Sequence, residues 1–161
     1  MIFLSSMRMK LIQFFILSLL LVSCVSLPAI NERALSPKSL NMKIETLAGE
    51  TVFAKGYVVL GTNSRCLYES KDVYMQMLND YEYDFEAFQN NYGDTRITLL
   101  NPNVVMENRN QLEGETLVLK GILITDYDYL NGNPIDLQAC SENALVVDED
   151  YLRRLNAGEV L

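Results

Sequence analysis

The sequence predicts a mainly β fold with helices (α+β), arranged as a five-stranded Greek-key barrel with an inserted helical segment. Five short segments rich in β-branched and aromatic residues are separated by turn-forming or helical stretches. In addition, the stretch "LAGETVFAKG" at 47–56 returns as "LEGETLVLKG" at 112–121, with six of the ten positions identical. In so short a chain, this repeat favours two strands that occupy equivalent places in one sheet.

The first half of the domain is expected to contain a β-hairpin followed by a helix. Residues 50–61 alternate well enough for a strand, and residues 65–70 form a second strand after the turn-forming "GTNS". From Lys71 to Gly93 the chain lacks proline, and apolar residues recur at the helical spacing of Val73, Met77 and Tyr81. Gly93 marks the expected end of this inserted helical segment.

The second half is expected to supply three more strands, at 95–100, 115–125 and 144–149. Between the first two of these, a helix is predicted from its end signals. Asn101 is the expected cap, Pro102 takes the first helical position and Gly114 follows the end. Both faces of the strand at 115–125 are apolar, so it is expected to be central. A closing helix is predicted at 150–158.

Without the insertion, the order of elements is β-β-β-α-β-β, which is the order of the OB-fold. In that barrel the first and fourth strands are neighbours, and these are the two strands that carry the repeat. Gly56 and Gly121 are expected at equivalent bends, and Gly49 and Gly114 at the turns that begin each strand. The sequence therefore favours an OB-fold-like barrel. A β-sandwich, which can use the same kind of strand, is the alternative.

The N-terminal residues predict a secretory signal. Arg8 and Lys10 precede an apolar run from Leu11 to Val22, shorter than the roughly 20 apolar residues that a membrane-spanning helix needs. The "LVSC" that follows resembles the bacterial lipobox. That resemblance implies cleavage after Ser23 and a lipid anchor on the thiol of Cys24. An uncleaved anchor or a plain secretory signal is the alternative.

The same resemblance implies the outer membrane, because Val25 rather than an aspartate follows the cysteine. A start at Met7 or Met9 gives a more typical signal length. The two prolines and three serines of residues 24–43 are typical of a linker. The predicted organisation is a signal peptide at 1–23, a lipidated tether at 24–43 and the OB-like domain at 44–161.

Charge and composition exclude several classes of function. Cleavage removes Arg8 and Lys10 but no acid, which leaves 11 basic and 21 acidic side chains and a net charge of −10. Such a surface repels nucleic acid; it favours a basic partner or serves solubility alone. The chain contains no histidine, so a Ser-His-Asp triad, a Cys-His nucleophile and a zinc site built on imidazole are excluded. We expect no cofactor and no metal.

Cys66 and Cys140 are expected to form a disulfide, because two thiols of a small domain commonly pair in an oxidising envelope. The fold prediction agrees with this pairing. In an OB-fold the loops between strands one and two and between strands four and five project from the same end, and each cysteine lies beside one of them. A lone reactive thiol is the alternative.

With these segments in view, the chain resembles a group of small, uncharacterised bacterial envelope lipoproteins. Besides the lipobox, the motifs that carry the resemblance are "VFAKGY" at 52–57, "LYESKD" at 67–72 and "GETLVLKG" at 114–121. The resemblance covers residues 45–150 and implies no known activity or ligand.

The candidate binding surface comprises Lys55, Tyr57, Tyr68 and Lys120. Two other stretches carry weaker signals. "DYDYLNGN" at 126–133 matches only the first positions of a calcium loop, so a polar turn is expected there. "DYEYDFEAF" at 80–88 interleaves aromatic and acidic side chains; it is either a partner surface or, as we expect, the buried stripe of the inserted helix.

Two functions follow as hypotheses. The first is a lipid-anchored, non-catalytic module that binds a protein or another envelope component through the end of the barrel near the two cysteines. The second is an acidic inhibitor of a basic hydrolase such as a lysozyme, with the net charge steering the encounter. No spacing singles out a pair of carboxylates for glycan hydrolysis, so an enzyme ranks third.

Overall fold

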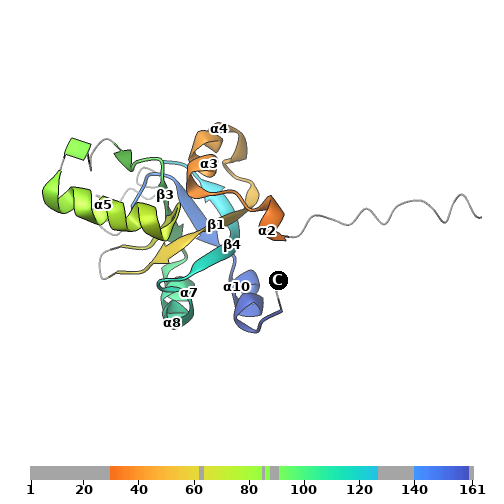
Figure 1. Cartoon of the computed structure of the whole chain (residues 1–161). Coiled ribbons are helices and arrows are strands. Elements are labelled where there is room, and N and C mark those ends of the chain that lie inside the picture. The colour runs from red at the N-terminus through yellow and green to blue at the C-terminus, as the bar shows by residue number, and fades with distance from the viewer. Residues whose placement is uncertain (1–29, 62–63, 85, 88–90, 127–139, 160–161) are drawn as a thin grey trace, which may run out of the picture.

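The computed structural model describes residues 30–61, 64–84, 86–87, 91–126 and 140–159. The predicted signal peptide, the anchor at Cys24 and nearly all of the "DYDYLNGN" stretch lie outside these residues. The described chain is α+β, with one five-stranded mixed sheet and helices around it (Figure 1).

The five strands confirm the predicted segments in number, order and position. They are β1 (Thr51–Val59), β2 (Cys66–Tyr68), β3 (Arg96–Leu100), β4 (Thr116–Ile124) and β5 (Ala144–Val147). Hydrogen bonding connects them in the order β1-β2-β3-β5-β4, and β4 pairs back with β1, so the sheet closes on itself. Four pairs are antiparallel and the β3–β5 pair is parallel. A closed ring with an odd number of strands cannot alternate in direction throughout, so a parallel pair is required.

The two copies of the repeat form the β1–β4 pair, as predicted. Its register brings together Ala54 with Leu119, Val52 with Gly121, and Gly56 with Leu117. Because the copies are sixty-five residues apart, Ala54 and Leu119 are equivalent positions. A local two-fold relation about this pair makes the pair Val52–Gly121 equivalent to the pair Leu117–Gly56. The turns obey the same local two-fold relation. The Gly49 amide donates to the Leu123 carbonyl at 2.7 Å, and its counterpart, the Gly114 amide, donates to the Val58 carbonyl at 2.9 Å.

The glycine spacing that the two copies of the repeat share has a steric cause. A Cβ on Gly56 would lie 2.4 Å from the carbonyl oxygen of Tyr68 on β2, and a Cβ on Gly121 would lie 2.4 Å from that of Val146 on β5. Each glycine therefore lets the next strand approach at an equivalent point of the closed sheet. This close approach is the reason that the same sequence pattern occurs in both strands.

The apolar core is divided into two clusters. The larger fills the interior of the closed sheet, and its fully buried side chains include Val58, Leu67, Ile97, Leu99, Leu119, Leu123 and Leu145. The smaller lies outside the sheet, between β1, β2 and the helix α5 (Lys71–Tyr83), and contains Tyr57, Val59, Cys66, Tyr68, Met77 and Tyr92. The inserted helix is thus bound to the outer face of the first hairpin.

The remaining helices after β1 lie at other sides of the sheet (Figure 1). Two short helices, α7 (Pro102–Glu107) and α8 (Arg109–Leu112), connect β3 to β4 in place of the single helix expected there. Pro102 holds the first helical position, as predicted, but the Asn101 side chain makes no capping hydrogen bond. The closing helix α10 (Glu149–Asn156) follows β5, as predicted, with Asp148 as its N-cap.

The prediction that residues 24–43 form a tether is wrong for the part of the chain that the structure describes. Residues from Ile30 onward pack on the sheet as helices α2 (Ile30–Arg33), α3 (Pro37–Met42) and α4 (Ile44–Leu47). Leu40 is fully buried in the larger cluster. The amide of Leu35 donates to Phe53 at 2.8 Å, and that of Lys55 donates to the Leu35 carbonyl at 2.9 Å. The folded domain therefore begins well before Ile44.

The physical reason lies in how serine and proline act at a helix start. Ser36 caps α3 by accepting a hydrogen bond from the Ser39 amide at 3.3 Å, and Pro37 occupies the first turn. Proline is favoured at that position because its ring fixes a helical φ, and because a backbone N–H in the first turn would make no intrahelical hydrogen bond. Ser36 and Pro37 are therefore helix-start signals rather than parts of a linker.

Candidate functional site

The four residues of the expected binding surface do not form one surface. Lys55 faces Val118 across the β1–β4 pair, and Lys120 faces Phe53, so the two lysines do share the outer face of these strands. Tyr57 and Tyr68 face each other across β1 and β2 instead. Their exposed fractions are only 9% and 4%. The expectation is therefore wrong for the tyrosines, because α5 covers them.

The covered tyrosines form an aromatic cluster with Tyr74 of α5. The ring of Tyr74 lies 5.8 Å from that of Tyr57 and 4.9 Å from that of Tyr68, measured between ring centroids. Burial raises the pKa of Tyr68 and of Tyr74; at Tyr68 the nearby Arg96 acts in the opposite direction. Because both pKa values lie above the ordinary value, the hydroxyls stay neutral at physiological pH. This cluster holds α5 on the sheet and offers no ionised nucleophile.

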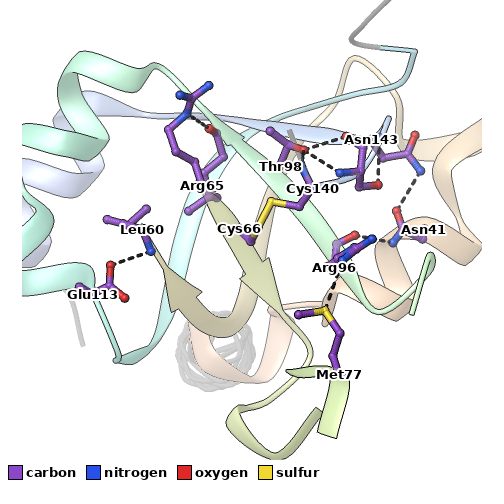
Figure 2. Close-up of a disulfide and its surroundings, with 12 residues drawn as sticks. Asn41, Leu60, Arg65, Cys66, Met77, Arg96, Thr98, Glu113, Cys140 and Asn143 are labelled. Carbon is purple, nitrogen blue, oxygen red and sulfur yellow. Dashed lines mark hydrogen bonds between the residues drawn. A yellow bond between two sulfur atoms is a disulfide. The ribbon is translucent and has the colours of Figure 1, made fainter. Parts of the chain in front are cut away.

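Cys66 and Cys140 form the predicted disulfide, with their Cα atoms 5.9 Å apart (Figure 2). It joins β2 to the segment that leads into β5. The hydroxyl of Thr98 holds the same segment: it accepts from the amides of Cys140 and Ser141, each at 3.0 Å, and donates to the Ser141 carbonyl at 2.7 Å. The segment around the disulfide is thus braced by hydrogen bonds from Thr98, which indicates a structural role.

A polar pocket of about 340 Å³ lies beside this disulfide, between α3 and the start of β5. Its amide side chains are engaged within the protein. Asn41 donates to the carbonyls of Asp94 and Arg96, at 2.7 and 3.0 Å, and Asn143 donates to the Asn41 side chain at 2.9 Å (Figure 2). These bonds tie α3 to β3 and β5. These bonds stabilise the N-terminal helices and engage the donors of Asn41 and Asn143, while Oδ1 of Asn143 is buried without a hydrogen-bond partner among the described residues.

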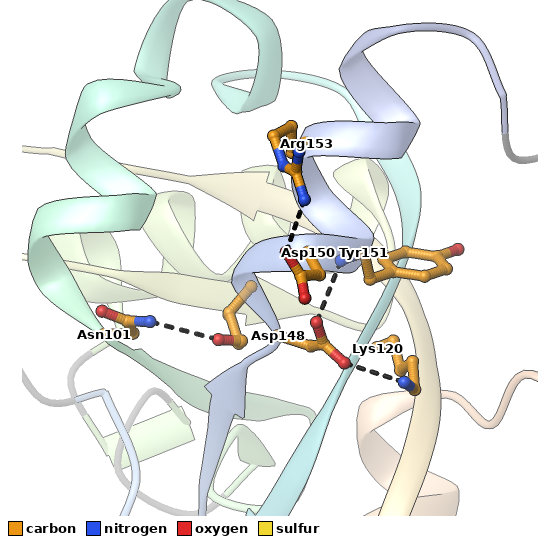
Figure 3. A network of polar contacts seen from close by, with 7 residues as sticks. Asn101, Lys120, Asp148, Asp150, Tyr151 and Arg153 are labelled. Carbon is orange, nitrogen blue, oxygen red and sulfur yellow. Dashed lines mark hydrogen bonds and ion pairs between the residues drawn. The ribbon is translucent and has the colours of Figure 1, made fainter.

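Lys120 is neutralised by a carboxylate of the closing helix. Its Nζ lies 2.8 Å from Oδ2 of Asp148, and the other carboxylate oxygen accepts from the Tyr151 amide at 2.9 Å (Figure 3). The hydrogen bond from Lys120, followed by that from the Tyr151 amide, lowers the pKa of Asp148. Asp148 thus caps α10 and, through its ion pair with Lys120, links this helix to β4. Lys120 has a structural partner and is not a free cation for a ligand.

Lys55 is placed differently. Its side chain is exposed, and among the described residues no carboxylate lies within ion-pair distance of it. It borders a groove of about 390 Å³ over the outer face of β1 and β4, between α2 and α10. The other residues that line the groove are mostly apolar: Ile30, Asn31, Thr116, Leu117, Val118, Tyr151 and Leu155.

Apolar and aromatic side chains are exposed at several points around α5. Met75 is 53% exposed and Leu78 41%, while Tyr81 and Tyr83 are 61% and 75% exposed. Only Met77 of this helix is fully buried. The expectation that the aromatic residues of 80–88 form a buried stripe is therefore wrong for the two tyrosines. Phe85 and Phe88 lie outside the described residues.

The reason is that the buried line of α5 runs through Val73, Tyr74 and Met77 and then ends. The helix ends at Tyr83, and Tyr81, one turn after Met77, is already exposed. Beyond the helix, the hydroxyl of Tyr92 donates to Asp80, which raises the pKa of Tyr92 to about 12 and holds the returning chain against α5. The helical spacing alone could not show that Tyr81 leaves the contact.

Acidic side chains surround this exposed face. Between residues 69 and 86 the only basic residue is Lys71, against the acids Glu69, Asp72, Asp80, Glu82, Asp84 and Glu86. We use the name acidic-aromatic face for the exposed surface of α5, defined by Met75, Leu78, Tyr81, Tyr83 and the acids Asp72 and Glu82, which are distributed around the helix.

Neither a metal centre nor a membrane-spanning helix is found in the described part of the chain. No group of three potential metal ligands comes together there. No helix in the same residues is long and apolar enough to cross a bilayer. No protein-family model matches the sequence, and neither a curated protein nor a solved structure with significant similarity to it was found.

Proposed function

We propose that this chain is a lipid-anchored, non-catalytic binding module of the bacterial cell envelope, and that it captures a basic protein through the acidic-aromatic face of α5. The observation that carries the proposal is the exposure of Met75, Leu78, Tyr81 and Tyr83 on a helix surrounded by carboxylates. Exposed apolar area of this kind is typical of protein interaction sites.

We further propose that the closed sheet is an OB-fold-like barrel. The strand order β1-β2-β3-β5-β4, the parallel β3–β5 pair and the helical connection between β3 and β4 support this assignment. OB-folds commonly bind oligonucleotides on the face of strands two and three. Here α5 packs on the outer side of β1 and β2. The covered hairpin and the acidic charge both support a protein partner over a nucleic acid.

Charge and apolar area have separate roles in the proposed binding. The acids around α5 raise the encounter rate with a basic partner and fix its orientation. Tyrosine and methionine side chains then supply contact area that is desolvated on binding, which is where most binding energy resides. A partner that fits this surface has an apolar patch bordered by lysine or arginine.

The anchor is part of the same proposal. Cys24 of the "LVSC" motif lies six residues before Ile30, where the described fold begins. At about 3.5 Å per residue, six residues span at most about 21 Å. The helices α2 and α5 lie on opposite sides of the sheet (Figure 1). A lipid on Cys24 therefore places the α2 side near the membrane, most simply the outer membrane given Val25, and leaves the acidic-aromatic face pointing away from it.

Site-specific photo-crosslinking tests the proposed binding face. Leu78 is replaced by p-benzoylphenylalanine in the full-length protein in cells, and Gln111, which is exposed on α8, is replaced in the same way as a matched control. We expect a discrete crosslinked species of higher mass from position 78 and none from position 111. Equal crosslinking at the two positions, or none at position 78, contradicts the proposal.

An inhibitor of a basic hydrolase such as a lysozyme is the second candidate. The acid-rich α5 and the disulfide next to its packing surface favour it, since such inhibitors must bind a strongly basic enzyme and persist outside the cytoplasm. A turbidity assay of cell-wall lysis, with and without the purified protein, tests it. Lysis that continues unchanged at a several-fold molar excess of the protein removes this candidate and leaves the first one standing.

A further inference from the structure

The groove between α2 and α10 is of the size and composition of a ligand site. Its volume of about 390 Å³ lies within the range of roughly 300–1,000 Å³ that is typical of small-molecule sites. Leu117 and Val118 of β4 line it, together with Ile30 of α2 and Leu155 of α10 on either side. Such a lining favours an apolar chain.

One charge borders this apolar lining. Lys55 is exposed and has no ion-pair partner among the described residues, whereas the neighbouring Lys120 is neutralised by Asp148 at 2.8 Å. Lys55 is the one charged side chain among the described residues that line the groove. A flexible lysine can extend its charge to the edge of an apolar site and meet a phosphate there. The groove is therefore complementary to an amphiphile with an anionic head.

The position of the groove in the chain indicates where such an amphiphile comes from. Ile30 and Asn31 both line the groove, and Cys24 precedes Ile30 by six residues, at most about 21 Å of chain. If Cys24 carries the proposed lipid anchor, the groove lies on the side of the domain that faces the membrane.

We propose that this groove binds an acyl chain of an anionic phospholipid from the membrane, with the lipid phosphate at Lys55. The proposal rests on the proposed anchor for the source of the lipid, but the groove itself is independent of the acidic-aromatic face. It makes the domain two-sided, with a lipid site next to the membrane and a partner surface on the opposite side.

The absence of tryptophan from the chain allows a specific optical test. A single tryptophan is introduced into the mature protein by Leu155→Trp at the groove, or by Met75→Trp on α5 as the control. Each protein is mixed with vesicles that contain brominated phosphatidylglycerol or brominated phosphatidylcholine, whose bromines quench tryptophan on close approach. We expect Leu155→Trp to be quenched at least about twofold more strongly by the brominated phosphatidylglycerol, and Met75→Trp to remain unquenched.

A second substitution separates lipid binding from simple proximity to the bilayer. Lys55→Gln in the Leu155→Trp protein is expected to remove the preference for phosphatidylglycerol. Equal quenching by the two lipids, quenching that Lys55→Gln does not change, or no quenching of Leu155→Trp each overturns the proposal. The mass of the N-terminal peptide tests the lipid on Cys24 separately. Phosphatidylglycerol-specific quenching in a protein without that lipid supports the groove while it removes the anchor.

Discussion

Gly56→Ala and Gly121→Ala are expected to destabilise the fold by similar and large amounts. In each case the added methyl group would lie 2.4 Å from a backbone carbonyl oxygen of the adjacent strand, that of Tyr68 for Gly56 and that of Val146 for Gly121. Overpacking of this kind costs about 1–3 kcal/mol. Because the obstructing atoms belong to paired backbone rather than to flexible side chains, we expect about 3 kcal/mol for each substitution.

The assay is urea-induced unfolding with the disulfide intact, followed by far-ultraviolet circular dichroism. Gly93→Ala is the matched control, because a Cβ at Gly93 would meet no atom within 4 Å. That change is expected to be neutral, or to stabilise the fold by about 0.4–1 kcal/mol through the reduced entropy of the unfolded chain. The reasoning is refuted if Gly56→Ala falls within about 0.5 kcal/mol of this control, or if it costs far less than Gly121→Ala, since the two sites are equivalent.

Three further predictions concern single features of the structure. Replacing Cys66 and Cys140 together by serine removes a link across 74 residues, which is worth about 4.5 kcal/mol in the chain-entropy model. In urea unfolding, reductant should therefore lower the free energy of unfolding of the wild type by this amount and leave that of the variant unchanged. Asp148→Ala removes the cap of α10 and the partner of Lys120, so it should cost about 1–2 kcal/mol at pH 7. Because the pKa of Asp148 is lowered in the folded protein, the stabilisation by its carboxylate is complete above the unfolded pKa of about 3.9. This stabilisation is lost as the pH falls through the folded pKa. A destabilisation by Asp148→Ala that stays constant down to pH 2 contradicts this assignment. Asp72→Lys with Glu82→Lys should reduce crosslinking from position 78 several-fold at low salt, whereas Glu45→Lys with Glu107→Lys, an equal change of net charge elsewhere, should not.

The sheet could be predicted from the sequence because its signals are local or repeated. Alternation of apolar residues locates each strand within two residues of its observed ends. The repeat at 47–56 and 112–121 indicates that β1 and β4 are equivalent neighbours, and the disulfide agrees with the loops of that arrangement. Each of these inferences needs only short-range patterns together with the geometry of a small closed sheet.

The candidate site could not be predicted in the same way, because it depends on contacts between distant segments. Tyr57 and Tyr68 are covered by α5, and nothing in their own strands indicates the position of that helix. Lys120 forms an ion pair with Asp148, 28 residues later in the chain. Lys55, at the equivalent place in the repeat, has no ion-pair partner among the described residues. The roles of two identical residues are thus decided by the elements packed beside them.

The N-terminal segment shows a different limit. Serine and proline near residue 36 are as typical of linkers as of helix starts, and composition alone does not separate the two. What decides the matter is Leu40, which fills a place inside the closed sheet. Its apolar character was visible in the sequence, but the place that it fills was not.

The measurement that tests the central claim most directly is the nuclear Overhauser effect between α-protons of β1 and β4. In the observed register Phe53 faces Lys120 and Lys55 faces Val118. In an antiparallel pair, alternate facing residues bring their Cα atoms to about 4.5 Å, so strong α-proton contacts are expected at every second one of the pairs from Thr51–Ile122 to Tyr57–Thr116. Contacts that follow this register about Ala54 and Leu119 support the account. Their absence, or a shift by one residue, contradicts the paired repeat, and with it the groove over β1 and β4.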